Sequence, residues 1–303
     1  MASFEVGCFF PYSEIEVDPA LMRGFARSVE AMGYDYLANA DHVIGVNRAS
    51  RPDWPGHYDV TERFYDPLML FSHLAAVTER IQFISSVIVA PQRQTVLLAQ
   101  QAANLDVYCN GRLKLGFSPG WNAIESEALG MSFADRGARF NDQIPLLRRL
   151  WSEPHVVYKS EFHNIPDCGL TVPPIQRPIP IIVAGNAPVA MRRAARLGDG
   201  WMPFLTADNA AEKIGRYHDA VLAEGRDPAD APLYVLVHLG SGKDGAGDGT
   251  FRDPEQVAED VEIWREVGAG AALINSMERD LNGAAAHLDA FGRIAELLKL
   301  PLN

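Results

Sequence analysis

Two neighbouring residues with catalytic potential follow the second apolar segment of the chain. Asp41 and His42 follow residues 34–39 after a single residue, Ala40, and the run 34–39 predicts a buried strand. Histidine has an ordinary pKa near neutral pH, so an imidazole at a strand end suits proton transfer. A hydrogen-bonded loop histidine without a catalytic role fits the same residues. The pair therefore marks a candidate site without identifying a reaction.

A second candidate lies at the end of the apolar run 180–184. Ala184, Gly185, Asn186 and Ala187 lead into a helical stretch that begins with Pro188. Glycine lets a ligand approach the backbone closely, and the free amides of a helix N-terminus attract anions. The turn therefore predicts a phosphate site, with a purely structural strand-to-helix turn as the alternative.

Two more strand ends carry unusual residues. Ser85 and Ser86 interrupt the apolar run 81–89, and Pro119, Gly120 and Trp121 follow the run 113–117. Small residues let a flat group approach the backbone, and Trp121 can stack on a ring. The alternatives are small side chains that fit a crowded interior and a tryptophan that caps it.

The remaining histidines and the cysteines show no metal-ligand spacing. His57, in a long polar connection, is the other histidine we associate with the site. Cys8, Cys109 and Cys168 are an odd number of distant thiols, so we expect no metal centre and no disulfide framework. Serine-hydrolase elbows, phosphate-binding P-loops and dinucleotide-binding glycine motifs are missing from the sequence.

The order of elements places these strand ends together. Apolar strands alternate with amphipathic helices along the whole chain, and eight strand–helix units can be counted. This number favours a closed (β/α)8 TIM barrel over an open doubly wound sheet. Two connections, 45–65 and 156–179, break the rhythm as insertion loops. Residues 1–303 are therefore expected to form a single barrel domain, whose strand ends meet at one mouth.

Composition narrows the functional classes. The chain has 303 residues, 48% hydrophobic content and a formal net charge of −12. Such a charge argues against non-specific binding to nucleic acid or to anionic membranes. Neither a signal peptide nor an apolar run long enough for a membrane span is visible. We therefore expect a cytoplasmic protein that acts on a small molecule.

The candidate residues, taken together, resemble the luciferase-like monooxygenase superfamily, and within it the F420-dependent oxidoreductases. The resemblance extends over nearly the whole chain. The matching segments are Asp41-His42, Ser86-Val87, Gly111-Arg112, Gly120-Trp121 with Glu125 and Gly130, residues 136–139, Leu150-Trp151 and residues 194–201.

The resemblance implies a flavin-like coenzyme at the barrel mouth. Ser86 and Val87 would form a non-prolyl cis peptide behind the tricyclic ring, with Asp41, Val89, Pro119 and Gly120 around the ring. Ala184, Gly185 and Asn186 would hold the ribityl or phosphate portion. His42 aligns with the catalytic histidine, and Trp121 and His57 would line the substrate pocket. The family also leads us to expect a homodimer.

The resemblance favours the deazaflavin coenzyme F420, and thus hydride transfer. Sugar-phosphate dehydrogenases of this branch carry a glutamate and a tryptophan where this chain has Trp121 and Val46. Oxidation of glucose 6-phosphate is therefore not expected, and reduction of an enone, imine or nitroaromatic is. Two alternatives stay open: a two-component monooxygenase using reduced flavin mononucleotide (FMN), and a non-catalytic relative that binds the coenzyme.

Overall fold

Eight parallel strands form a barrel at the centre of the computed structural model, which describes residues 4–206, 210–240 and 251–302. They run in the order β10-β11-β1-β2-β3-β5-β8-β9, and a bridge between Trp201 and Leu233 brings β9 back to the start of β10. The barrel predicted from the sequence is thus confirmed, and an open doubly wound sheet is excluded. The barrel strands are β1 (Glu5–Phe9), β2 (Tyr36–Asn39), β3 (Gln82–Ser85), β5 (Leu113–Ser118), β8 (Ile181–Ala184), β9 (Gly200–Met202), β10 (Tyr234–His238) and β11 (Ala271–Asn275).

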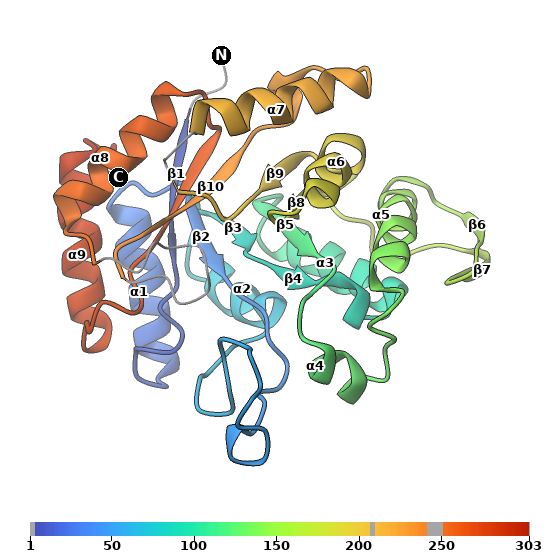
Figure 1. Cartoon of the computed structure of the whole chain (residues 1–303), viewed down its shortest axis with the longest axis horizontal. Coiled ribbons are helices and arrows are strands. Elements are labelled where there is room, and N and C mark those ends of the chain that lie inside the picture. The colour runs from blue at the N-terminus through green and yellow to red at the C-terminus, as the bar shows by residue number, and fades with distance from the viewer. Residues whose placement is uncertain (1–3, 207–209, 241–250, 303) are drawn as a thin grey trace.

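Helices surround the strands, as Figure 1 shows. They are α1 (Pro19–Ala31), α2 (Pro67–Ala75), α3 (Thr95–Tyr108), α4 (Ala123–Ala128), α5 (Arg136–Ser152), α6 (Pro188–Leu197), α7 (Ala210–Ala223), α8 (Pro254–Glu266) and α9 (Gly283–Leu297). Several begin with a proline, where the missing N–H is no loss, and Asp18, Asp66 and Asp253 cap α1, α2 and α8. Strands β2, β8, β10 and β11 are buried along their whole length, as expected for strands covered by helices.

The structure adds detail to the sequence-based prediction in three places. The run 81–89 is two strands, β3 and β4 (Ile88–Val89), separated at the cis peptide bond between Ser86 and Val87. Residues 123–152, where helical residues were expected, contain α4 and α5, and Gly130 with a φ of 69° lies between the two helices. The connection 156–179 holds an antiparallel hairpin, β6 (Val156–Lys159) and β7 (Asn164–Cys168), which lies outside the barrel beside α5 (Figure 1).

The connection 45–65 contains the short 3-10 helix η1 (Arg48–Ser50) and an isolated β-bridge between Val46 and Asp59. Figure 1 shows it leaving the barrel at the same end as α4. Strand ends and helix N-termini meet at this end, which is the mouth of a (β/α)8 barrel. Among the residues that the structure describes, no helix combines the length and apolar character needed to cross a bilayer.

Candidate active site

His42 is held at the barrel mouth by a buried carboxylate. It follows β2, and its Nδ1 lies 3.1 Å from Oε2 of Glu125 on α4. Asn122 caps α4 by accepting hydrogen bonds from the amides of Ile124 and Glu125, which fixes the helix that carries the carboxylate. Since an ionised carboxylate only accepts hydrogen bonds, His42 donates from Nδ1 and keeps Nε2 for another partner.

Glu125 is fully buried but well supplied with donors. The amide of Val43 donates to Oε1 at 2.6 Å, and Nε2 of Gln92 lies 3.3 Å from Oε2. Burial alone raises the pKa of a carboxyl group, but the hydrogen bonds from His42, Val43 and Gln92 outweigh it and lower the pKa of Glu125. The side chain therefore stays ionised at neutral pH and keeps the orientation of the imidazole.

Aromatic rings surround the imidazole on its other sides. Ring centroids lie 4.9 Å from His42 for Phe64, 5.5 Å for Tyr58 and 5.6 Å for Trp121. Trp54 stacks on Trp121 at 5.7 Å. Because Trp54, Tyr58 and Phe64 all belong to the 45–65 region, this connection packs over the catalytic candidate and partly shields it from water.

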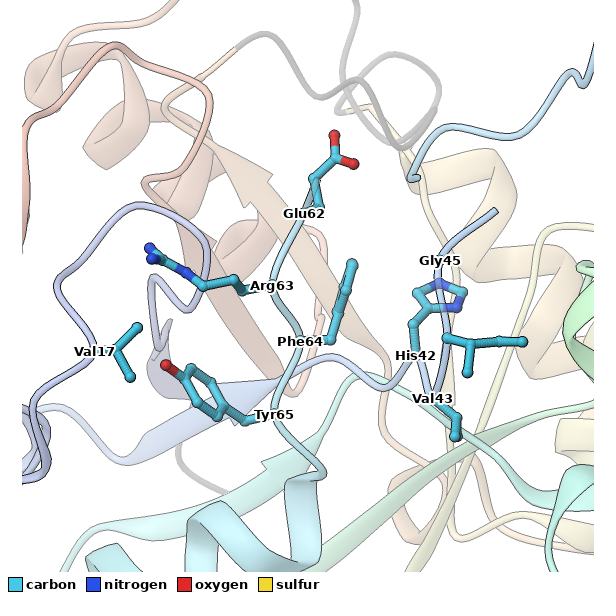
Figure 2. A pocket seen from close by; sticks show the side chains of 9 residues that line it. Val17, His42, Val43, Gly45, Glu62, Arg63, Phe64 and Tyr65 are labelled. Atoms are coloured by element: carbon cyan, nitrogen blue, oxygen red, sulfur yellow. The ribbon is translucent and has the colours of Figure 1, made fainter. Parts of the chain in front are cut away.

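A cavity of about 350 Å³ opens beside His42. Figure 2 shows His42 and Val43 on one side of the 62–65 segment, with Arg63 and Tyr65 extending toward Val17 on the other. The residues that line this cavity are Val17, His42, Val43, Ile44, Gly45, Glu62, Arg63, Phe64 and Tyr65. Of the two residues predicted to line the substrate pocket, Trp121 borders a much smaller hollow next to His42. His57 packs on Trp121 and Tyr58 and is not among the walls of either.

Asp41 has a structural partner. Its Oδ1 accepts a hydrogen bond from Nη2 of Arg93 at 2.8 Å, and Arg93 also bonds to Asp66 at 2.9 Å. Burial raises the pKa of Asp41, and the Arg93 guanidinium opposes that rise. The triple arrangement ties the end of β2 to the starts of α2 and α3. A contact between Asp41 and a coenzyme ring stays a prediction.

The strand break at Ser86 and Val87 is surrounded by close backbone packing. The cis peptide bond lies between β3 and β4, and Ser86 Oγ contacts Met202 Sδ at 3.3 Å. Gly120 has a φ of 84°, and a Cβ there would lie 2.5 Å from Val89. Pro119 precedes this turn. The predicted ring-binding residues Ser86, Val87, Val89 and Gly120 therefore gather along one wall, formed by β4 and the end of β5.

The turn after β8 is exposed and open to an anion. Gly185 adopts a φ of 124°, and its carbonyl accepts a hydrogen bond from Trp201 Nε1 at 3.0 Å. Ala184 is buried at the strand end, and the side chain of Asn186 accepts from the amide of Phe204 at 2.6 Å. No side chain caps α6, so its first amides are available to a ligand.

Arg193, on the helix that follows this turn, lacks a carboxylate partner among the described residues. Arg193 of α6 is 7% exposed and bonds through Nε to Asn141 at 2.7 Å. Burial and the neighbouring Arg196 lower the pKa of Arg193, which remains far above neutrality for a guanidinium. Positive charge without a counter-ion suits a phosphate.

Sequence reasoning missed the supporting residues of the site. Glu125 lies in a segment that carries the family resemblance, but no role could be given to it from its position. Gln92 and Arg93 follow β4 without any motif. Each acts through partners more than 30 residues away, so no local pattern could reveal it. Within the described ranges, no group of three histidine, cysteine, aspartate or glutamate residues is arranged to hold a metal ion.

A (β/α)8 barrel with a histidine–carboxylate pair, an aromatic shield and an uncapped helix N-terminus at its mouth is a framework typical of enzymes that act on small molecules. The chain belongs to the luciferase-like monooxygenase family, whose profile matches residues 3–280. The predicted family is therefore confirmed, and with it a flavin-type oxidoreductase.

The proteins similar to this chain include an F420-dependent dehydrogenase and a monooxygenase. An uncharacterized protein of Mycobacterium tuberculosis is 33% identical over 198 residues, which are 64% of this chain and 68% of that protein. The F420-dependent glucose-6-phosphate dehydrogenase of Kineococcus radiotolerans is 27% identical and covers 86% of this chain and 72% of its own. The crystal structure of the monooxygenase RslO1 from Streptomyces bottropensis has a TM-score of 0.79 at 19% identity, covering 98% of this chain and 99% of that one.

Proposed function

We propose that this protein is an F420-dependent oxidoreductase that transfers hydride between the coenzyme and a small organic substrate. The observation that carries the proposal is His42, oriented by the ionised and fully buried Glu125 at the mouth of the barrel. When bound, the deazaflavin would supply the hydride at its C5 atom, and the protein would supply orientation, exclusion of water and the proton.

The residues present fit such a coenzyme. The wall of Ser86, Val87, Val89 and Gly120 offers a surface on which a planar ring can rest close to backbone. The turn at Gly185 and Asn186 offers free amides to a phosphate, with Arg193 on the same helix. Both ends of the proposed site thus match the chemistry of the two ends of the coenzyme.

His42 would exchange the proton that accompanies hydride transfer. Its Nδ1–H is committed to Glu125, so only Nε2 can take or give a proton. Phe64, Tyr58 and Trp121 keep the ring in place and limit access of water. Reduction of a conjugated carbonyl compound, an imine or a nitroaromatic needs no further acid–base group beyond this one.

Two other functions compete with this proposal. The Streptomyces structure with the same fold belongs to a monooxygenase, so a two-component enzyme that uses reduced FMN and oxygen is the second candidate. The third is a coenzyme-binding relative without catalysis. The similarity to an F420-dependent dehydrogenase over 86% of the chain is our reason for preferring F420.

A fluorescence titration tests the coenzyme. We expect F420 to bind at micromolar or tighter concentrations, while oxidised and reduced FMN bind at least about tenfold more weakly, a difference of about 1.4 kcal/mol. The reverse preference would replace the proposal with the monooxygenase. F420 binding without turnover of any enone, imine or nitroaromatic would favour the non-catalytic relative.

We also propose that the protein acts in the cytoplasm as a homodimer. Cys8, Cys109 and Cys168 are all free thiols, as expected in a reducing compartment. The outer face of α3 exposes Val96, Leu97 and Tyr108 at 45%, 49% and 65%. Its single charged residue, Asp106, is buried. Each copy carries a net charge of −12, so electrostatic repulsion between two copies is smallest when they meet at an uncharged surface. We therefore propose this face of α3 as the dimer interface.

A further inference from the structure

The cavity beside His42 combines apolar walls with one fixed guanidinium. Val17, Val43, Ile44 and Phe64 supply the apolar lining, and the first three are exposed by 63%, 48% and 41%. Aliphatic side chains exposed around a cavity mark a binding surface for an apolar ligand. A sugar phosphate would find few hydrogen-bonding partners on these walls.

Arg63 is oriented by the backbone of another loop. Its Nη2 donates to the carbonyls of Ser13 and Ile15 at 2.8 and 2.7 Å, between β1 and α1. Among the described residues, its Nε and Nη1 have no hydrogen-bond partner and no carboxylate pairs with it. A guanidinium held in this way is ready to receive a planar oxyanion without losing much side-chain entropy.

The other charged lining residue, Glu62, is turned away from Arg63. Figure 2 shows the two side chains leaving the segment in different directions, with Arg63 on the side of Val17 and Tyr65. Glu62 Oε2 accepts a hydrogen bond from the amide of Asp59 at 2.7 Å, so its charge already has a partner. The cavity therefore presents a positive group at one side and the imidazole of His42 at the other.

From this arrangement we propose that the cavity binds a small aromatic or conjugated carboxylate, with its ring against Phe64 and Ile44 and its carboxylate on Arg63. A volume of about 350 Å³ is near the lower end for ligand sites, which span roughly 300–1,000 Å³, and suits a molecule of one ring with a short side chain. The inference rests on the proposed function only in treating this cavity as the substrate side of His42.

Binding of trans-cinnamate and of its neutral amide, cinnamamide, to the coenzyme-free protein tests this inference by calorimetry or ligand-observed NMR. We expect cinnamate to bind at least about tenfold more tightly than cinnamamide, since a charge-assisted hydrogen bond from the free Nε or Nη1 of Arg63 is worth that factor or more. Arg63→Gln should weaken cinnamate by the same factor and leave cinnamamide within about twofold. The unchanged amide would show that the loop anchored by Arg63 is intact.

The matched control is Arg51→Gln, which removes the same charge from an exposed side chain of the same connection. It should leave both affinities unchanged, and Arg63→Lys should retain part of the preference for cinnamate. Equal affinities of the wild-type protein for acid and amide, failure of both to bind, or an equal loss in Arg51→Gln would each overturn the inference. None of these measurements uses F420, so failure here is distinct from failure of the coenzyme titration.

Discussion

His42 and Glu125 lie 83 residues apart in the chain and are joined by a hydrogen bond of 3.1 Å between Nδ1 and Oε2. The imidazole side chain is 12% exposed, whereas the carboxylate is fully buried. A charged group without solvent depends on its donors for stability. The hydrogen bond between Glu125 and His42 therefore stabilises the fold at the barrel mouth and also orients the imidazole that we propose for proton transfer.

Removing the imidazole should abolish most of the turnover. For His42→Ala we expect kcat to fall by about 10²–10⁴-fold, the usual contribution of a general acid or base, with F420 affinity within about threefold of wild type. Stopped-flow oxidation of reduced F420 measures both. His73→Ala is the control, because His73 lies on α2 and its hydrogen-bond partners are Arg23 and Pro19 of α1, neither of which belongs to the candidate site. Full activity in His42→Ala would remove His42 from the mechanism.

Removing the charge behind the imidazole should cost stability. Glu125→Ala leaves His42, Val43 and Gln92 without their acceptor, and we expect a loss of about 3–5 kcal/mol in the free energy of unfolding. Glu125→Gln should cost less, about 1–3 kcal/mol. Glu127→Gln, on the exposed face of the same helix, should change stability by less than about 0.5 kcal/mol. Urea denaturation at pH 7 distinguishes these values.

The same carboxylate should make stability depend on pH. The pKa of Glu125 is lower in the folded protein than in the unfolded chain, so ionised Glu125 stabilises the fold fully above the unfolded-state pKa of about 4.3. This contribution is lost as pH falls through the folded-state pKa. The stability difference between wild type and Glu125→Gln should therefore shrink between about pH 5 and pH 3. A difference independent of pH would contradict an ionised Glu125.

Substitution of two glycines between β5 and α5 distinguishes the cost of backbone strain from the cost of a steric clash. Gly120 and Gly130 both have positive φ, 84° and 69°, but a Cβ meets Val89 at 2.5 Å only in Gly120. Gly130→Ala should cost about 1–2 kcal/mol from the left-handed backbone alone. Gly120→Ala should cost about 1–3 kcal/mol more and also weaken F420 binding. Equal effects of both substitutions on F420 affinity would argue against a ring resting on this wall.

The uncharged face of α3 can be tested by introducing charge. Leu97→Lys should convert the dimer to a monomer in sedimentation velocity, because an unpaired ammonium would be buried in the contact. Leu222→Lys on α7, where the wild-type residue is 59% exposed, should leave the dimer intact. A monomeric wild-type protein at micromolar concentration would refute the proposed dimer.

Local patterns were sufficient for most of the fold. The alternation of apolar runs with amphipathic helices predicted the barrel, because each strand and helix must bury one surface against its neighbours. The patterns failed where tertiary contacts overrode them. The break of the run 81–89 at Ser86-Val87 and the hairpin of β6 and β7 depend on packing against β5 and α5, which no window of sequence contains.

The candidate site also combines residues that the sequence could predict with residues that only the tertiary structure reveals. The sequence by itself determined that His42, Gly120 and Gly185 stand at strand ends, and parallel strands in a barrel bring those ends to one face. Only the tertiary structure decided what surrounds them. Glu125 behind His42, Arg93 on Asp41 and Arg63 in the cavity come from separate segments, and a hydrogen bond between distant segments forms only when packing brings donor and acceptor together.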